Sequence, residues 1–240
     1  MTLALGIIVA LPAEASALSR HIPALARTVE ISNNVNLIVS GIGIAPAERA
    51  ANLLMDQGSN ALLSFGTAVG ISPICKAGDI IIAKTCLDSC NHSWPAHPHW
   101  HQTLYNLLSQ HKSINVLTET LCESERLLNN RLEKEKIFAS TGAIAVDMES
   151  AAIARMAHTH HLPFLSLRAI VDSLDRHIPA VVTNAMDKQG NVNTGKLLLG
   201  LFRQPTALMP LIQLAGSFYL AKKALVNCRK IAGLDFRVTA

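Results

Sequence analysis

The stretch Ala143-Ile144-Ala145-Val146-Asp147-Met148-Glu149-Ser150-Ala151-Ala152-Ile153-Ala154 decides the fold. Its apolar first part has the length and composition of a buried strand, and the small residues at its end have helical spacing. Asp147 and Glu149 therefore lie where a strand meets a helix. In layered α/β proteins ligands bind at such strand ends, and the free N–H groups of a helix start stabilise a carboxylate. The alternative is that both acids are solvated residues of a first helical turn.

Other apolar runs extend this pattern along the chain. We predict strands over residues 3–10, 35–40, 61–65, 78–84, 114–117 and 163–171, with helices over about 12–20, 46–57, 101–110 and 124–136. Strands that alternate with helices predict an α/β fold with a mixed or mostly parallel central sheet between helix layers. We expect a single domain over residues 1–240, which ends in an apolar helical tail at about 195–230.

Composition narrows the function classes. The chain has 240 residues, of which 50% are hydrophobic and 16% charged, so it can bury a full core. The net charge of +4 comes with no basic stripe, which argues against nucleic acid as a partner. Five cysteines without a CxxC pair favour free thiols in a reducing, cytoplasmic location. The apolar start of the chain lacks a basic region and a cleavage site, and we interpret it as a strand.

The residues that follow the strands share a chemical character. They are small or acidic: Glu14 after the first strand, Gly41 and Gly43 after the second, Gly66 and Thr67 after the third, and then Asp147, Glu149 and Asp172. Parallel strands would bring these ends to one rim, where glycines let the backbone approach a ligand. Acids without matching bases favour a cationic transition state, such as an oxocarbenium sugar.

Several of these stretches resemble the purine nucleoside phosphorylase and nucleosidase superfamily. They match in order: Gly6-Ile7-Ile8-Val9-Ala10-Leu11-Pro12-Ala13-Glu14, Ser40-Gly41-Ile42-Gly43, Ser64-Phe65-Gly66-Thr67-Ala68-Val69-Gly70, Ala145-Val146-Asp147-Met148-Glu149 and Arg168-Ala169-Ile170-Val171-Asp172-Ser173-Leu174-Asp175. Within the superfamily the pattern is similar to the methylthioadenosine/adenosylhomocysteine nucleosidase branch, and there to the hopanoid-associated phosphorylases. The resemblance implies a three-layer nucleoside phosphorylase-like fold.

The resemblance also implies site residues. Asp172 would protonate purine N7, which requires a carboxyl group of raised pKa. Glu149 would accept hydrogen bonds from the ribose hydroxyls, and Met148 would pack on the sugar. Glu14 would position or deprotonate the nucleophile, and Thr67 would hydrogen-bond the nucleophile or the sugar. The same resemblance places Gly66, Gly41 and Gly43 against the substrate.

Two readings of the reaction follow from this resemblance. The first is cleavage of adenosylhopane to adenine and a ribosyl or phosphoribosyl hopane. The alternative is hydrolysis of methylthioadenosine or adenosylhomocysteine, and a catalytically inactive nucleoside- or lipid-binding member is a third hypothesis. No organic cofactor is implied, inorganic phosphate stays open as a co-substrate, and Arg49 is a speculative phosphate ligand. The family resemblance implies a homodimer.

Two further features have competing interpretations. The first is a Pro-rich stretch that carries His92, His97, His99 and His101. These histidines lack the compact spacing of metal ligands, so we predict no metal site and expect a loop or a substrate cover there. Trp94 and Trp100 on the same stretch either cover the substrate or simply pack. Residues 207–221 are apolar nearly all round and precede Lys222 and Lys223. This segment is either buried in the fold or a dimer, or makes peripheral contact with the inner face of the membrane.

Overall fold

The computed structural model describes residues 3–126, 128, 130–172 and 208–239. Eleven strands in this part form one sheet. They are β1 (Leu5–Val9), β2 (Thr28–Ser32), β3 (Val35–Val39), β4 (Ala61–Gly70), β5 (Ile80–Ile82), β6 (Thr85–Leu87), β7 (Ser93–Pro95), β8 (Val116–Leu117), β9 (Thr120–Glu123), β10 (Ala145–Asp147) and β11 (Phe164–Asp172). The helices are α1 (Pro12–Leu18), α2 (Ile44–Asp56), α3 (Pro98–Ser109), α4 (Arg131–Thr141), α5 (Ser150–Thr159) and α8 (Leu208–Ala232).

The sheet is mixed. Its main path runs β2-β3-β1-β4-β10-β9-β6-β7, and β11 pairs with both β4 and β5. β1 is parallel to β3 and β4, and β11 is parallel to β4, whereas β10 is antiparallel to β4. The carboxyl ends of β1, β3, β4 and β11 therefore meet at one edge. This confirms the predicted α/β class and the predicted meeting of these four strand ends. The strand before Asp147 departs from the prediction, because β10 runs antiparallel to β4.

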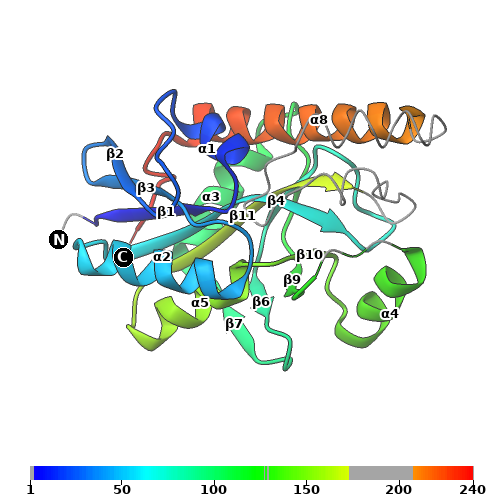
Figure 1. Ribbon diagram of the computed structural model, residues 1–240, viewed down its shortest axis with the longest axis horizontal. Coiled ribbons are helices and arrows are strands. Elements are labelled where there is room, and N and C mark those ends of the chain that lie inside the picture. Colours follow the sequence, from blue (N-terminus) through cyan, green and yellow to red (C-terminus); the bar gives the residue numbers. More distant parts are fainter. Residues whose placement is uncertain (1–2, 127, 129, 173–207, 240) are drawn as a thin grey trace.

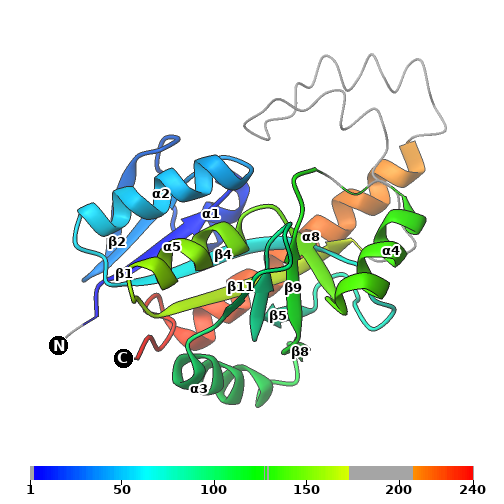
Figure 2. The same ribbon diagram turned by 90° about the horizontal axis from the view of Figure 1, so that it is seen from below.

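Helices cover both faces of the sheet (Figures 1 and 2). One apolar cluster packs α1, α3 and α8 against one face, and a second packs α2 and α5 against the other. The burial follows the sequence: Ala47, Ala50, Ala51 and Leu54 face the sheet from α2 at helical spacing. The small residues of α5 do the same, because alanines let a helix approach the strands closely.

The stretch around residue 147 folds as predicted. β10 ends at Asp147, and α5 begins at Ser150 with Glu149 as its N-cap residue. β4 is longer than expected and continues from Phe65 to Gly70, since its small residues remain buried between neighbouring strands. These two elements bring two of the predicted motifs into the centre of the sheet.

Two predictions on the middle of the chain are wrong. The helix over 124–136 begins only at Arg131, because Asn130 accepts a hydrogen bond from Glu133 N as the N-cap. The stretch over 89–101 contains β7 and the start of α3 rather than one loop. Trp100 is fully buried and donates from Nε1 to Phe236 O at 2.8 Å, so it belongs to the core and covers no substrate.

The C-terminal helix α8 has two different halves. Ala221, Leu225 and Cys228 are 0–1% exposed and pack into the core, whereas Ile212 and Tyr219 in the first half are more than half exposed. Residues 195–207 of the predicted tail lie outside the described part. None of the described helices combines the length and apolar character that crossing a bilayer requires.

Candidate active site

The carboxylate of Glu14 joins the end of β1 to β4. Glu14 lies in the first turn of α1, which Pro12 begins, and is 4% exposed. Its Oε2 accepts hydrogen bonds from the backbone N–H groups of Ala10 and Leu11, both at 3.0 Å. Its Oε1 accepts from the backbone N and from Oγ1 of Thr67, both at 2.8 Å. Four donors therefore fix the position of this carboxylate.

Glu149 connects the start of α5 to the loop between β3 and α2. Its Oε1 accepts from the backbone N of Gly43 at 2.9 Å. Gly43 has φ +101° and Gly41 has φ +87°, a region that favours glycine. Burial raises the pKa of Glu149 well above its usual range, although the nearby Arg168 opposes this change. The charged form of this side chain is therefore disfavoured by burial and supported by Arg168.

A buried cation lies between these acids. Arg168, in β11, is 1% exposed, and its Nε lies 2.7 Å from Oδ2 of Asp147. Its Nη2 donates to Oγ of Ser64 at 2.6 Å and of Ser150 at 3.0 Å, and lies 3.8 Å from Oε2 of Glu149. Burial alone would lower the pKa of Arg168, but the surrounding carboxylates raise it above its ordinary value. The guanidinium is therefore held charged in the interior.

Gly66 lets this guanidinium and the carboxylate of Glu14 approach the backbone of β4 closely. A β-carbon at Gly66 would lie 2.5 Å from Nη1 of Arg168 and 2.6 Å from Oε1 of Glu14. Nη1 is buried and has no hydrogen-bond partner among the described residues. A buried N–H donor without a partner is costly, which makes it a binding group for an incoming oxygen. A donor and a carboxylate oxygen thus converge over Gly66.

Asp172 lies at the same edge of the sheet. β11 ends at this residue, and a register shift after Ile170 pairs the backbone of Asp172 with Val69 of β4. The side chain of Asp172 lies outside the described part. Met148 is half-buried between Asp147 and Glu149. The structure therefore gathers Glu14, Thr67, Gly66, Gly43 and Glu149, and brings the backbone of Asp172 to the same rim.

The residues that organise this cluster are not among those predicted from the sequence. Arg168 is the first residue of the motif that runs from Arg168 to Asp175. Ser64, Ser150 and Ser166 form a fully buried hydroxyl network around it. The available signal in the sequence is an arginine in a largely apolar strand, since charged residues are rarely buried unpaired. Arg49, the earlier candidate cation, is exposed on α2.

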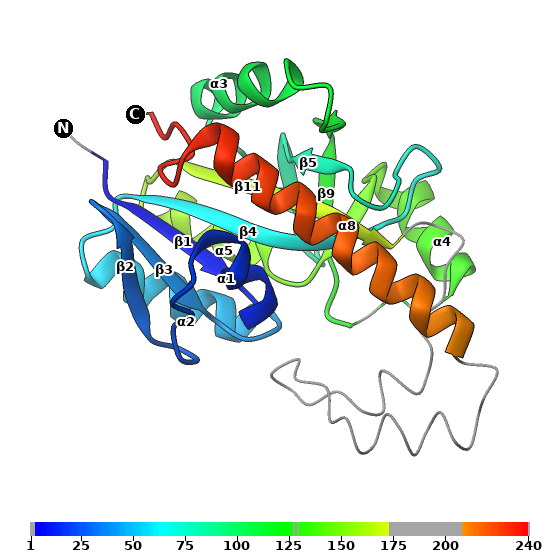
Figure 3. The same ribbon diagram turned by 90° about the horizontal axis from the view of Figure 1, so that it is seen from above.

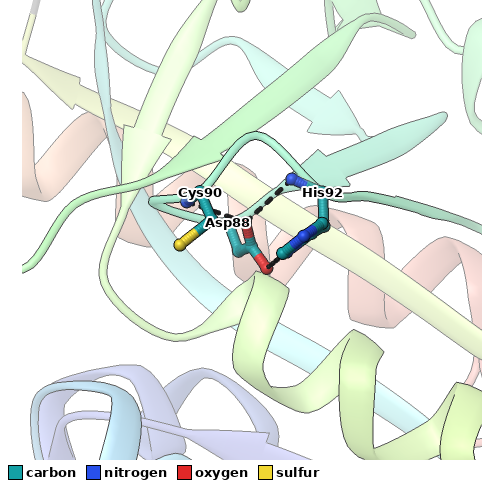
Figure 4. A group of neighbouring side chains, drawn as sticks. All are labelled: Asp88, Cys90 and His92. Carbon is teal, nitrogen blue, oxygen red and sulfur yellow. Dashed lines mark hydrogen bonds and ion pairs between the residues drawn. The ribbon is translucent and has the colours of Figure 1, made fainter.

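A second group of side chains has potential metal-ligand atoms close together (Figure 4). Among the described residues, Asp88, Cys90 and His92 bring potential ligand atoms within 4.8 Å of one another. Oδ1 of Asp88, however, accepts from the backbone N of Cys90 and of His92, and Oδ2 contacts Nδ1 of His92 at 3.0 Å. Burial alone would raise the pKa of Asp88, but these hydrogen bonds lower it. The cluster is accounted for as the turn of the β6–β7 hairpin.

Sequence comparisons identify relatives of the chain. The family profile described as "Phosphorylase superfamily" matches residues 4–198. The chain is 24% identical over 195 residues to the 5′-methylthioadenosine/S-adenosylhomocysteine nucleosidase of Pseudoalteromonas translucida, covering 73% of this chain and 82% of that protein. It is 30% identical over 159 residues to the protein so named from Baumannia cicadellinicola, covering 59% and 69%.

Solved structures are similar over almost the whole chain. The S-adenosylhomocysteine nucleosidase of Streptococcus pyogenes, in complex with 5-methylthiotubericidin, has a TM-score of 0.72 at 16% identity and covers 100% of this chain and 99% of that one. The futalosine hydrolase of Helicobacter pylori has a TM-score of 0.67 at 14% identity, covering 95% and 97%. The likeness confirms the nucleoside phosphorylase-like fold.

Proposed function

Because the chain belongs to the phosphorylase superfamily, we propose that it releases adenine from 5′-substituted adenosines, with 5′-methylthioadenosine and S-adenosylhomocysteine as its first candidate substrates. It is an enzyme of the nucleosidase and phosphorylase type, which cleaves N-glycosidic bonds. The sequence pattern alone favours adenosylhopane. The curated relatives favour the alternative, hydrolysis of the methylthio and homocysteine nucleosides.

The convergence of Arg168 Nη1 and Glu14 Oε1 over Gly66 carries this proposal. A water molecule placed there would accept a hydrogen bond from Nη1 and donate one to Oε1. This arrangement orients the oxygen lone pair of the water for attack on a sugar carbon and gives the leaving proton an acceptor. Thr67 assists indirectly, because its two hydrogen bonds hold Oε1 in place.

The charges around Arg168 support water rather than phosphate as the nucleophile. The carboxyl groups of Asp147, Glu149 and Glu14 all act electrostatically on the one guanidinium. A phosphate dianion entering beside Nη1 would meet more negative than positive charge in a buried environment, where repulsion is poorly screened. A neutral water molecule avoids this cost.

The remaining roles follow from the family resemblance and form part of the proposal. Asp172 donates a proton to N7 as adenine departs, which neutralises the base while the sugar becomes cationic. Glu149 accepts hydrogen bonds from the ribose hydroxyls through Oε2, since its Oε1 already binds Gly43. Met148 packs on the sugar. Protonation of a leaving group by such an acid typically contributes ~10²–10⁴-fold in rate.

The test measures adenine release from both nucleosides with and without inorganic phosphate. We expect equal rates in both buffers and a free reducing sugar as the second product. A rate that depends on phosphate, with a sugar 1-phosphate as product, would overturn the choice of nucleophile. No adenine from any 5′-substituted adenosine would favour the inactive, nucleoside-binding hypothesis.

The variant Asp172→Asn tests the acid. We expect its turnover to fall ~10²–10⁴-fold, because the amide cannot supply the proton. Asp56→Asn, on the exposed end of α2, is the matched control and is expected to keep full activity. Unchanged turnover in Asp172→Asn would remove this residue as the acid.

Adenosylhopane remains the second candidate substrate because of one observation. The exposed apolar half of α8 lies at the sheet edge where β11 ends (Figure 1). A lipid substituent at the 5′ position would find apolar surface there. Competition between adenosylhopane and 5′-methylthioadenosine in the same adenine assay decides which has the higher kcat/KM.

We further propose a cytoplasmic homodimer that uses no cofactor and binds no nucleic acid. The family resemblance is the support for the dimer, and the free cysteines support the reducing compartment. Light scattering after size-exclusion chromatography measures the mass directly. A mass near 25.8 kDa at micromolar concentration would contradict the dimer.

A further inference from the structure

The first half of α8 gathers the exposed apolar residues of the protein. Of the ten large hydrophobic side chains that are exposed in the described part, five lie between Leu208 and Leu220. Met209, Ile212, Tyr219 and Leu220 are 63%, 57%, 67% and 47% exposed. Helical geometry places these four within about 100° of one another around the axis. We call them the α8 apolar face.

This face points away from the core. The buried residues of α8, among them Ser217, Ala221 and Cys228, occupy the opposite side of the helix. The buried second half anchors the helix on β11, α1 and α3 through Leu225 and Ala232. The apolar face is therefore held rigidly outward. Exposed apolar side chains that are gathered on one face of a helix in this way mark an interaction site.

The charges of α8 indicate the partner. The helix carries no acidic residue, and Lys222, Lys223, Arg229 and Lys230 follow the apolar half. Lys223 lies on the same side of the helix as Ile212 and Tyr219, about 16 Å from Ile212 along the axis at 1.5 Å per residue. Apolar and aromatic side chains with lysines beyond them match the depth profile of an anionic bilayer surface.

The face lies beside the edge of the sheet that carries the candidate site. Figure 3 shows α8 crossing the sheet and extending beyond the end of β11. A β-carbon at Gly78 would lie 3.4 Å from Cβ of Leu220, and Gly78 N donates to Ile170 O at 2.8 Å, two residues before Asp172. A surface that held the α8 apolar face would therefore also be close to the carboxyl end of β11.

We propose that the α8 apolar face docks into the interface of an anionic lipid bilayer, with Lys222 and Lys223 at the level of the lipid head groups. The docking brings the carboxyl end of β11 to the bilayer, so that a nucleoside with a lipid-like 5′ substituent reaches the site without leaving the membrane. Only this last consequence rests on the proposed function. The docking itself rests on the exposed side chains and the charges of α8.

Vesicle sedimentation tests the docking. The full chain is mixed with vesicles of phosphatidylcholine containing 30% phosphatidylglycerol, or of phosphatidylcholine alone. We expect sedimentation with the anionic vesicles and a strong decrease at high salt. The double variant Lys222→Ala, Lys223→Ala should lower the partition coefficient on the order of tenfold, since each lysine near an anionic surface contributes favourably.

The apolar contribution is tested separately. Ile212→Gln with Tyr219→Gln should abolish sedimentation, whereas Ile22→Gln, which removes a 45% exposed apolar side chain from the loop after α1, should not change it. Adenine release from soluble 5′-methylthioadenosine and the circular dichroism spectrum should stay unchanged, because these side chains contact neither site nor core. These two readouts separate failure of docking from failure of the proposed function.

Two results would overturn the proposal. One is equal sedimentation of wild type and Ile212→Gln, Tyr219→Gln. The other is a wild-type protein that does not sediment with anionic vesicles, together with a mass of Ile212→Gln, Tyr219→Gln in light scattering that is half the mass of the wild type. The second result would assign the face to an interface between two copies of the chain.

Discussion

Nε of Arg168 lies 2.7 Å from Oδ2 of Asp147, and both side chains are 2% exposed. The pair connects β11 to β10, two strands that do not hydrogen-bond to each other. It stands at the centre of the site, because the same guanidinium reaches Ser64, Ser150 and the vicinity of Glu149. The ion pair therefore fixes the strand ends relative to one another and orients Nη1, which has no hydrogen-bond partner among the described residues.

Removing this cation should destabilise the fold strongly. Arg168→Met leaves Asp147 as a buried carboxylate without its partner, which typically costs about 3–5 kcal/mol. The control is Arg155→Met, since Arg155 pairs with Glu48 at a partly exposed position and such pairs are worth about 0–1 kcal/mol. Urea denaturation gives both free energies of unfolding. Equal losses in the two variants would contradict the central role of the Arg168–Asp147 pair.

Gly66 should tolerate no side chain. In Gly66→Ala the new methyl group would lie 2.5 Å from Nη1 of Arg168 and 2.6 Å from Oε1 of Glu14, so both atoms must move. Displacing catalytic groups by about 1 Å typically costs on the order of 10²-fold in rate, and we expect kcat/KM to fall by that amount.

The matched control for this change is Gly216→Ala. A β-carbon at Gly216, in α8, would have no atom within 4 Å, and alanine favours a helix over glycine by about 0.8–1.0 kcal/mol. This variant should keep its activity and become slightly more stable. A Gly66→Ala enzyme as active as Gly216→Ala would show that the placement of Nη1 and Oε1 over Gly66 does not matter for the reaction.

The parts of the fold that the sequence predicted are those with strong local patterns. The runs around β1, β3, β10 and β11 are apolar and short, and each is bounded by glycine, proline or an acid, which is enough to place a strand. The β6–β7 hairpin and the start of α3 were not predicted, because the prolines and histidines at 89–101 show no hydrophobic periodicity. There the side-chain hydrogen bonds of Asp88 within the turn and the long-range hydrogen bond of Trp100 to Phe236 decide the structure.

The candidate site also has a part that could be predicted from the sequence and a part that could not. Glu14 and Gly43 follow β1 and β3, which run parallel to β4, so their approach to Thr67 could be predicted from the parallel order. The position of Glu149 could not, because β10 runs antiparallel to β4. The part of Arg168 could not, because it depends on register: Arg168 pairs with Gly66 across β11 and β4, 102 positions apart. No local pattern specifies which residue lies opposite the one glycine that lets its guanidinium pack so closely.

Glu149 should act through the hydroxyl groups of the ribose. In Glu149→Gln the amide oxygen can still accept from Gly43 N, but the carboxylate for the sugar is lost. Hydrogen bonds to charged groups are worth about 1.5–3 kcal/mol, so kcat/KM for 5′-methylthioadenosine should fall roughly 10- to 100-fold. With the 2′,3′-dideoxy analogue of this nucleoside the fall should be much smaller. Equal falls for both nucleosides would contradict a contact with the ribose.

Glu123 should make the stability depend on pH. This side chain is buried at the end of β9 and accepts a hydrogen bond from Ala152 N at 2.9 Å. Burial raises its pKa from 4.5 to about 7, and the hydrogen bond only partly opposes this. The folded protein then holds a proton that the unfolded chain has released, so the contribution is complete below about pH 4.5 and is lost as the pH rises through 7.

We therefore compare wild type with Glu123→Gln, which keeps an oxygen for Ala152 N but cannot ionise. Between pH 5 and pH 7 the wild type should lose up to about 1.4 kcal/mol of stability per pH unit relative to this variant, and the difference should level off above pH 8. Urea denaturation at each pH gives the difference directly, with Glu119→Gln as the control for removing one exposed carboxylate. A difference that does not change with pH would mean that Glu123 is already ionised in the folded protein at pH 5.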